Sequence, residues 1–107
     1  MNIIIDRPQL VRVVLLYLNN NFGNLTTKTG DDTVSYVNSY NETLILLSMI
    51  SRVSWFHGEK LWDKVESLFP LNYGEVQSIL ELWMRETYNV RYYTAERIWR
   101  DNVLNYS

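Results

Sequence analysis

The sequence has no cysteine and a single histidine, His57. Without cysteine, disulfide bonds, thiolate metal sites and cysteine nucleophiles are all excluded. One histidine is too few for a nitrogen-rich metal site, because zinc draws its protein ligands mainly from cysteine and histidine. His57-Gly58-Glu59 has the H-x-E spacing of zinc deaminases, but those enzymes also need a P-C-x-x-C run. We therefore expect no bound metal or cofactor, and we assign His57 to a loop or a helix start.

Glycine is also scarce, with four residues scattered at positions 23, 30, 58 and 74. This scatter leaves no Gly-rich loop that could cradle a phosphate. Gly30-Asp31-Asp32 has the order of the Gly-Asp-Asp turn of viral RNA polymerases, but here it lies between threonine-rich stretches. Those enzymes need a far larger scaffold and further acidic residues, so we interpret the triplet as a surface turn.

No pair of carboxylates stands out as a general acid and base. The pairs Glu59/Asp63 and Glu81/Glu86 do not converge on one helix face, and we interpret them as solvated surface charge. Glu81 and Arg85 have the spacing of an i,i+4 ion pair. We identify no catalytic residue, and we expect a protein that is not an enzyme.

Long apolar runs and a charge excess are missing too. The apolar N-terminal stretch is interrupted by Asp6, Arg7 and Arg12, which fits neither a secretory signal nor a membrane span. The formal net charge is −2, from 10 basic and 12 acidic residues, which argues against coating nucleic acid by bulk charge. The absence of cysteine is compatible with a reducing compartment. We expect a soluble, cytoplasmic protein without a membrane partner.

What the chain does have is hydrophobic and aromatic residues in abundance. Its 107 residues suit one domain, residues 1–107, and 47% of them are hydrophobic. Four tryptophans and eight tyrosines are many for this size. Because a buried tyrosine or tryptophan needs a partner for its polar tip, some of these rings are expected at the rim of the core or at an interface.

Helices are predicted in the first and the last third. The first starts at Asp6, has Ile5 and Leu10 at the spacing of a hydrophobic staple, and ends at Gly23. Its apolar residues wrap most of the circumference, so it is covered on two sides or covers a partner. Another helix carries Leu61, Trp62, Val65, Leu68 and Phe69 and ends at Pro70. A third follows a capping box of Asn72 and Glu75, and it buries Val76, Ile79, Leu80, Trp83 and Met84.

Three strands are predicted between the first two helices. Residues 23–33 are polar and are expected to form a loop. Segments rich in β-branched and aromatic residues follow at Thr33–Val37, Thr43–Ile50 and Arg52–Phe56. A short fourth helix, capped at Thr94 and carrying Ile98 and Trp99, is expected in the tail. The predicted fold class is α+β: a helix, a three-stranded antiparallel meander, two helices and a short helical tail, in two layers.

The charge distribution is uneven only near the C-terminus. Arginines at positions 85, 91, 97 and 100 are interleaved with Tyr88, Tyr92, Tyr93 and Trp99. Arginine beside stacking aromatics is typical of single-stranded nucleic-acid sites and of hot spots in protein interfaces, although such a segment can also pack on its own domain. The candidate partner-binding residues are Arg91, Tyr92, Tyr93, Arg97, Trp99 and Arg100.

One stretch resembles other proteins. Residues Leu61 to Tyr88, with the cadence Trp-Asp-x-Val-Glu-Ser-x-Phe-Pro-Leu-Asn-Tyr-x-Glu-Val-Gln, are similar to short uncharacterised proteins of phage and other viral genomes. This stretch is about a quarter of the chain. The resemblance implies a viral accessory or virion protein.

Binding is therefore the expected function. The leading hypothesis is a small protein-interaction module that contacts a host or viral protein. The alternative is a nucleic-acid-associated protein that uses the C-terminal arginines and aromatic rings. A homo-oligomer stays open.

Overall fold

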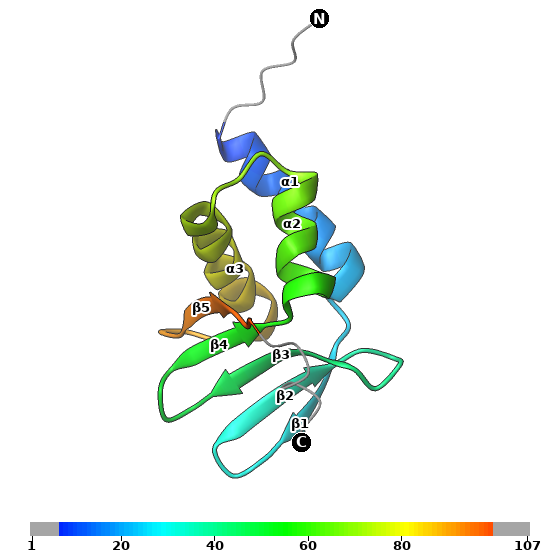
Figure 1. The fold of residues 1–107 in the computed structure, drawn as a ribbon, viewed down its shortest axis with the longest axis vertical. Coiled ribbons are helices and arrows are strands. Elements are labelled where there is room, and N and C mark those ends of the chain that lie inside the picture. Colours follow the sequence, from blue (N-terminus) through cyan, green and yellow to red (C-terminus); the bar gives the residue numbers. More distant parts are fainter. Residues whose placement is uncertain (1–6, 100–107) are drawn as a thin grey trace, which may run out of the picture.

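The computed structural model describes residues 7–99. Within them, five strands form one sheet in the order β1-β2-β3-β4-β5, and three α-helices lie together on one side of it (Figure 1). The predicted α+β class is confirmed. The sheet has two strands more than the three-stranded meander that we predicted, and all three helices contribute to the second layer.

Helix α1 (Arg7–Phe22) places a stripe of apolar residues against the sheet. Leu10, Val14, Leu18 and Phe22 follow one another at i,i+4 spacing and are all buried. The helix ends as predicted at Gly23, where any side chain would collide with the backbone carbonyl of Asn19. The predicted start at Asp6 and the staple from Ile5 lie outside the described residues.

Four strands form an antiparallel meander: β1 (Thr26–Thr29), β2 (Thr33–Val37), β3 (Thr43–Ser48) and β4 (Val53–Phe56). The last three confirm the predicted strands to within two residues at each end. The prediction of a loop over residues 23–33 is wrong for β1. All four β1 side chains are exposed, so the strand has no apolar alternation, and its backbone pairs with β2. Gly30-Asp31-Asp32 forms the predicted surface turn between them.

The predicted C-terminal helix is also wrong. Thr94–Arg97 forms β5, which runs parallel to β4. The backbone amides of Thr94 and Ile98 donate to the carbonyls of Arg52 and Phe56, at 3.1 and 3.0 Å. An isolated helical turn is unstable in water, whereas this segment gains a ladder of hydrogen bonds and the burial of Ala95.

Between β4 and β5 the chain forms three helical segments. A π-helical turn (Gly58–Trp62) leads into α2 (Asp63–Leu68). His57 caps the turn, because its Nδ1 accepts from the Lys60 amide at 3.1 Å, which confirms the helix-start role. Of the predicted apolar residues, Leu68 is exposed. Helix α3 (Tyr73–Tyr88) begins with the predicted capping box of Asn72 and Glu75.

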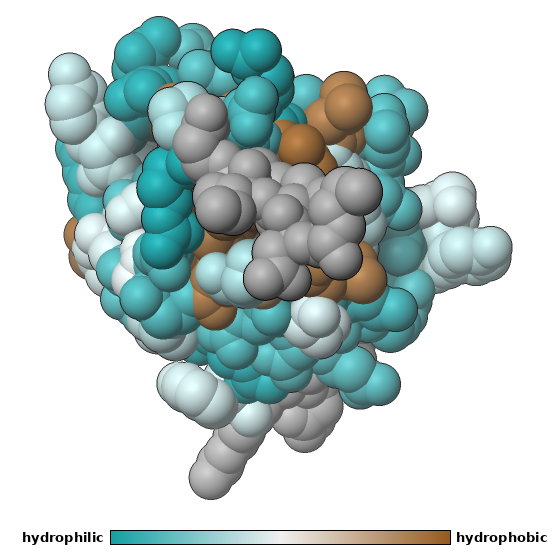
Figure 2. Space-filling model, turned by 90° about the horizontal axis from the view of Figure 1, so that it is seen from above, coloured by the Kyte–Doolittle hydropathy of each residue, from teal (hydrophilic) through white to brown (hydrophobic). Residues whose placement is uncertain are grey.

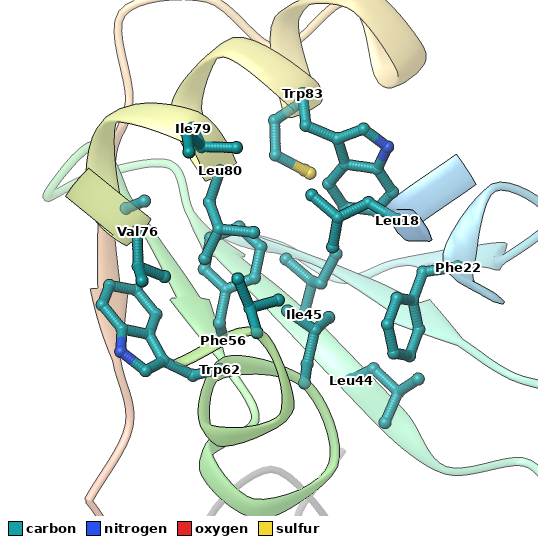
Figure 3. Close-up of a cluster of buried hydrophobic side chains, with 14 of the residues drawn as sticks. Leu18, Phe22, Leu44, Ile45, Phe56, Trp62, Val76, Ile79, Leu80 and Trp83 are labelled. Atoms are coloured by element: carbon teal, nitrogen blue, oxygen red, sulfur yellow. The ribbon is translucent and has the colours of Figure 1, made fainter. Parts of the chain in front are cut away.

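The core lies between the helices and the sheet (Figure 3). All five residues predicted to be buried on α3 are buried. Two rings of the core have partners for their polar tips, as expected for buried rings: Trp83 Nε1 donates to Asn19 Oδ1 at 2.9 Å, and Tyr88 Oη donates to the Phe22 carbonyl. Burial raises the pKa of Tyr88 above its ordinary value. These bonds tie the end of α3 to the end of α1.

Candidate interaction surface

The six candidate binding residues fall into two groups at the two ends of β5. Arg91, Tyr92 and Tyr93 lie in the loop that leads from α3 into the strand. Arg97 is the last residue of the strand, and Trp99 follows it. Arg100 lies outside the described residues. The structure therefore does not gather the predicted residues into one site.

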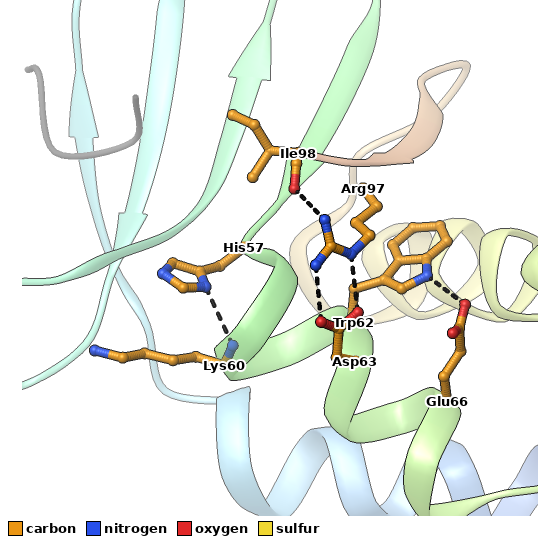
Figure 4. A network of polar contacts seen from close by, with 7 residues as sticks. All are labelled: His57, Lys60, Trp62, Asp63, Glu66, Arg97 and Ile98. Carbon is orange, nitrogen blue, oxygen red and sulfur yellow. Dashed lines mark hydrogen bonds and ion pairs between the residues drawn. The ribbon is translucent and has the colours of Figure 1, made fainter. Parts of the chain in front are cut away.

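Arg97 is bound within the fold (Figure 4). Its Nε and Nη2 donate to the two carboxylate oxygens of Asp63, each at 2.8 Å, and its Nη1 donates to the Ile98 carbonyl at 2.8 Å. The guanidinium also lies over the Trp99 ring, 4.5 Å from its centroid. Only 16% of the Arg97 side chain is exposed. This arginine fixes the end of β5 to the start of α2.

The same pair corrects our interpretation of Asp63. We took Asp63 and Glu81 as solvated charge, but both carboxylates bind groups of β5. The hydrogen bond from Arg97, with its positive charge, holds the pKa of Asp63 below its ordinary value, while partial burial acts in the opposite direction. Both residues therefore support the fold.

A cavity of about 350 Å³ lies at the other end of β5, between α3 and the loop that follows it. Its lining includes three of the six candidate residues. The full lining consists of Ser78, Glu81, Leu82, Arg85, Val90, Arg91, Tyr92 and Tyr93.

The loop is held in place by backbone bonds and unusual backbone angles. Asn89 ends α3 in the left-handed conformation, with φ of 57°, and the Val90 amide donates to the Met84 carbonyl at 3.1 Å. Tyr92 also has a left-handed φ, of 69°. That angle is costly for a bulky side chain. It turns the Tyr92 ring outward, where 89% of the residue is exposed.

Three arginines surround the two tyrosines. Arg85 and Arg91 line the cavity, and the Arg52 guanidinium lies 5.9 Å from the centroid of the Tyr93 ring. We call Arg52, Arg85, Arg91, Tyr92 and Tyr93 the arginine–tyrosine surface. Tyr93 is half-buried and packs against the core, so it joins this surface to the body of the protein.

The charges of this surface are not neutralised within the described residues. The predicted Glu81–Arg85 ion pair is absent there, because Glu81 Oε2 accepts from the Ala95 amide at 2.9 Å. Arg91 uses only its Nε, which donates to Asn89 Oδ1 at 3.2 Å. Arg85 and the two terminal nitrogens of Arg91 therefore have donors available for a bound molecule.

Other parts of the described surface show fewer features that suit binding. A shallower, largely apolar cavity of about 270 Å³ lies between the starts of α1 and α3, with Leu10, Leu71 and Ile79 in its lining. Figure 2 shows the helical end from above: outside the grey atoms most of the surface is hydrophilic, and hydrophobic residues emerge in separate places. Among the described residues, no acidic, histidine or cysteine side chains cluster in a way that could hold a metal ion. No helix in that part of the chain has the length and hydrophobicity of a membrane span.

Sequence reasoning found the loop residues of this surface but not all of their neighbours. Arg85 belongs to the uneven C-terminal charge, although we did not include it among the binding residues. Arg52 was missed entirely. It lies in the turn between β3 and β4, far from the others along the chain, and only the pairing of β4 with β5 brings it to Tyr93.

Comparison with models of protein families, with curated proteins and with solved structures finds no match for this chain. The function proposed below therefore depends on the geometry of the chain itself.

Proposed function

We propose that this chain is a non-enzymatic protein-interaction module that contacts its partner through the arginine–tyrosine surface. The observation that supports this most strongly is Tyr92, which is 89% exposed on a left-handed backbone beside the cavity. Packing of the core does not require this arrangement. Strained backbone of this kind is found preferentially at functional sites.

The chemistry of the surface suits protein recognition. Tyrosine and arginine are enriched at interface hot spots, because they offer large contact areas and several hydrogen bonds at a modest entropic cost. The cavity beside them has both apolar lining from Leu82 and Val90 and charged lining from Arg85 and Arg91. A partner side chain can be buried there and hydrogen-bonded at the same time.

The setting of this proposal is the viral one that we expected from the sequence of Leu61–Tyr88, and the comparisons with known proteins add nothing to it. A viral accessory or virion protein would use the surface to bind a host or viral protein, in the host cytoplasm or in the virion. Binding of a second copy of this chain is tested by sedimentation of the purified protein. Nucleic acid is the alternative ligand, favoured by the free arginine donors beside Tyr92.

A comparative capture experiment tests the proposal. The immobilised full chain is exposed to an extract of the cells in which it occurs, and captured proteins are quantified by mass spectrometry. Tyr92→Asn removes the exposed ring but keeps a residue that tolerates left-handed angles. We expect it to lose a specific partner at least tenfold while its melting temperature stays within a few degrees.

Tyr40→Asn is the matched control. Tyr40 is 82% exposed in the turn between β2 and β3, outside the arginine–tyrosine surface. This variant should retain the partner. Equal capture by wild type and Tyr92→Asn, or equal loss in both variants, would contradict a role for this surface.

A further inference from the structure

We infer that the arginine–tyrosine surface recognises an acidic segment of a protein, whose aspartate or glutamate carboxylates bind to Arg85 and Arg91 in the cavity. The inference rests on the proposed function and extends it by naming the chemistry of the bound partner.

Arg85 provides the first group of donors. It is exposed on α3, and no hydrogen bond or ion pair within residues 7–99 occupies its guanidinium. Its helical neighbour Glu81 is engaged with the Ala95 amide of β5. The bond that closes the edge of the sheet therefore removes the usual i,i+4 partner from Arg85.

Arg91 provides the second group. Its Nε donates to Asn89 Oδ1 at 3.2 Å, so the side chain is held by one nitrogen while both terminal nitrogens stay available. Asn89 is itself fixed as the cap of α3. A guanidinium oriented in this way loses less conformational entropy when it binds a carboxylate.

The surroundings of the two guanidinium groups favour an anion. Ser78, Tyr92 and Tyr93 add hydroxyl groups to the lining, and Glu81 is the single carboxylate of the residues that line the cavity. Arg52 adds a third positive charge beyond the Tyr93 ring. The apolar side chains of Leu82 and Val90 reduce hydration nearby, which strengthens a charged hydrogen bond.

A carboxylate-rich protein segment fits this surface better than a nucleic acid does. Tyr93 is half-buried with Arg52 over its ring, so within the arginine–tyrosine surface only the Tyr92 ring is highly exposed and available for base stacking. The lining contains no lysine, and its arginines form a compact group rather than a track along a phosphate backbone. Arginine binds carboxylates through two parallel hydrogen bonds.

The test measures binding of a fluorescein-labelled twelve-residue peptide of alternating glutamate and glycine to the full chain by fluorescence anisotropy. We expect saturable binding that weakens as salt is raised, and no binding of the peptide in which glutamine replaces glutamate. The variant Arg85→Gln/Arg91→Gln should weaken binding at least tenfold. Both side chains are exposed, so its melting temperature should stay within a few degrees of the wild-type value.

The control variant Arg12→Gln/Lys64→Gln removes the same charge from exposed positions on α1 and α2. It should bind the acidic peptide within twofold of wild type. Equal weakening in the two double variants would show a bulk charge effect, and the absence of saturation at millimolar peptide would show that no carboxylate site exists. Either result overturns the inference.

A single-stranded oligonucleotide of the same net charge is titrated in parallel. Tighter binding of the oligonucleotide than of the peptide at equal salt would overturn the inference in favour of nucleic acid. The capture experiment keeps the two proposals separate: loss of a partner in Tyr92→Asn, together with failure of the acidic peptide to bind, would leave the interaction surface standing and reject its proposed chemistry.

Discussion

At the scale of single residues, the position of the Arg97 side chain depends on the absence of a side chain at Gly58. Gly58 has no side chain, and any added Cβ would lie against the Arg97 guanidinium. That space lets the guanidinium reach both carboxylate oxygens of Asp63. The result is a planar pair, held between a glycine and the Trp99 ring, that joins two segments far apart in the chain.

This pair predicts a specific dependence of stability on pH. The pKa of Asp63 is lowered in the folded state, so its contribution to stability is complete above the ordinary carboxyl value of 3.8 and is lost as pH falls through the folded value. At pH 6, Asp63→Asn should reduce the free energy of unfolding by about 1 kcal/mol or less, because Asp63 is half-exposed and screened. Between pH 4 and pH 2 the difference from wild type should shrink.

Urea unfolding monitored by tryptophan fluorescence at several pH values measures this difference. Asp31→Asn is the control, because Asp31 is exposed in the turn between β1 and β2. A gap between wild type and Asp63→Asn that stays constant down to pH 2 would show that the ion pair does not stabilise the fold.

Removal of the buried Trp83 ring should also lower the stability of the protein. Trp83 is 1% exposed, and its indole nitrogen donates to Asn19. Trp83→Ala should lower the free energy of unfolding by about 3–5 kcal/mol, the usual cost of removing a large buried aromatic ring. Trp83→Phe should cost less, because it retains most of the packing. A loss under about 1 kcal/mol for Trp83→Ala in urea unfolding would show that the ring is not part of the core.

Burial could be predicted from the sequence for these residues, but their long-range partners could not. The helical spacing of Val76, Ile79, Leu80, Trp83 and Met84 determines which side of α3 faces inward, wherever the helix docks. The ion pair of Arg97 with Asp63 joins positions that only the folded chain brings together. Spacing along a sequence contains no information about such a contact.

At the scale of elements, α3 closes one edge of the sheet. Three residues on one side of the helix bond to β5: Glu81 accepts from the Ala95 amide, Gln77 donates to the Ala95 carbonyl at 2.9 Å, and the Tyr73 hydroxyl accepts from the Arg97 amide at 3.3 Å. The helix thus takes the place of a further strand. An edge protected in this way is less available for pairing with other chains.

Removal of one of these bonds should destabilise the β5 edge of the sheet. Glu81→Ala leaves the Ala95 amide without its acceptor and should lower the free energy of unfolding by about 1–2 kcal/mol. Amide hydrogen exchange at Ala95 should become faster. Glu86→Ala, an exposed change on the same helix, should alter neither quantity. Unchanged exchange at Ala95 in Glu81→Ala would mean that the side-chain bond does not protect the edge.

Elements with a local signal were predicted, and those without one were not. The capping box of Asn72 and Glu75 and the apolar strands β2 to β4 were predicted because the pattern of neighbouring residues is enough to indicate these structures. Strand β1 exposes all of its side chains, and β5 has a sequence, Thr-Ala-Glu-Arg, that also suits a helix. Pairing with a neighbouring strand decides the structure of both.

At the scale of the whole molecule, the two ends of β5 lie at two different features of the fold. The start of β5 leads out of the arginine–tyrosine surface and its end is fixed by the Arg97–Asp63 pair. Arg97→Gln should therefore lower the free energy of unfolding by about 1–2 kcal/mol, with any loss of acidic-peptide binding explained by the smaller folded fraction. Parallel melting and anisotropy measurements check this. A large loss of binding in fully folded Arg97→Gln would place Arg97 in the binding surface instead.

The mixed α+β class of the molecule could be predicted from the sequence, whereas the five-stranded sheet could not. Amphipathic helices beside apolar strands require a layered α+β domain. Only part of the arginine–tyrosine surface could be predicted, because the tyrosines and Arg91 lie together in the sequence, whereas Arg52 belongs to the turn between β3 and β4. A surface that forms only when the last strand joins the sheet cannot be predicted from the sequence until the pairing of that strand is known.

The parallel pairing of β5 with β4 also has a consequence for the order of folding. Strands β1 to β4 are joined by short turns, so they can pair while the rest of the chain is still unfolded. β5 must wait until α2 and α3 have bridged the distance back to β4, and closing that long loop costs chain entropy before any contact is gained. The arginine–tyrosine surface is therefore completed in the same late step, so a folding intermediate that contains only the meander lacks this surface.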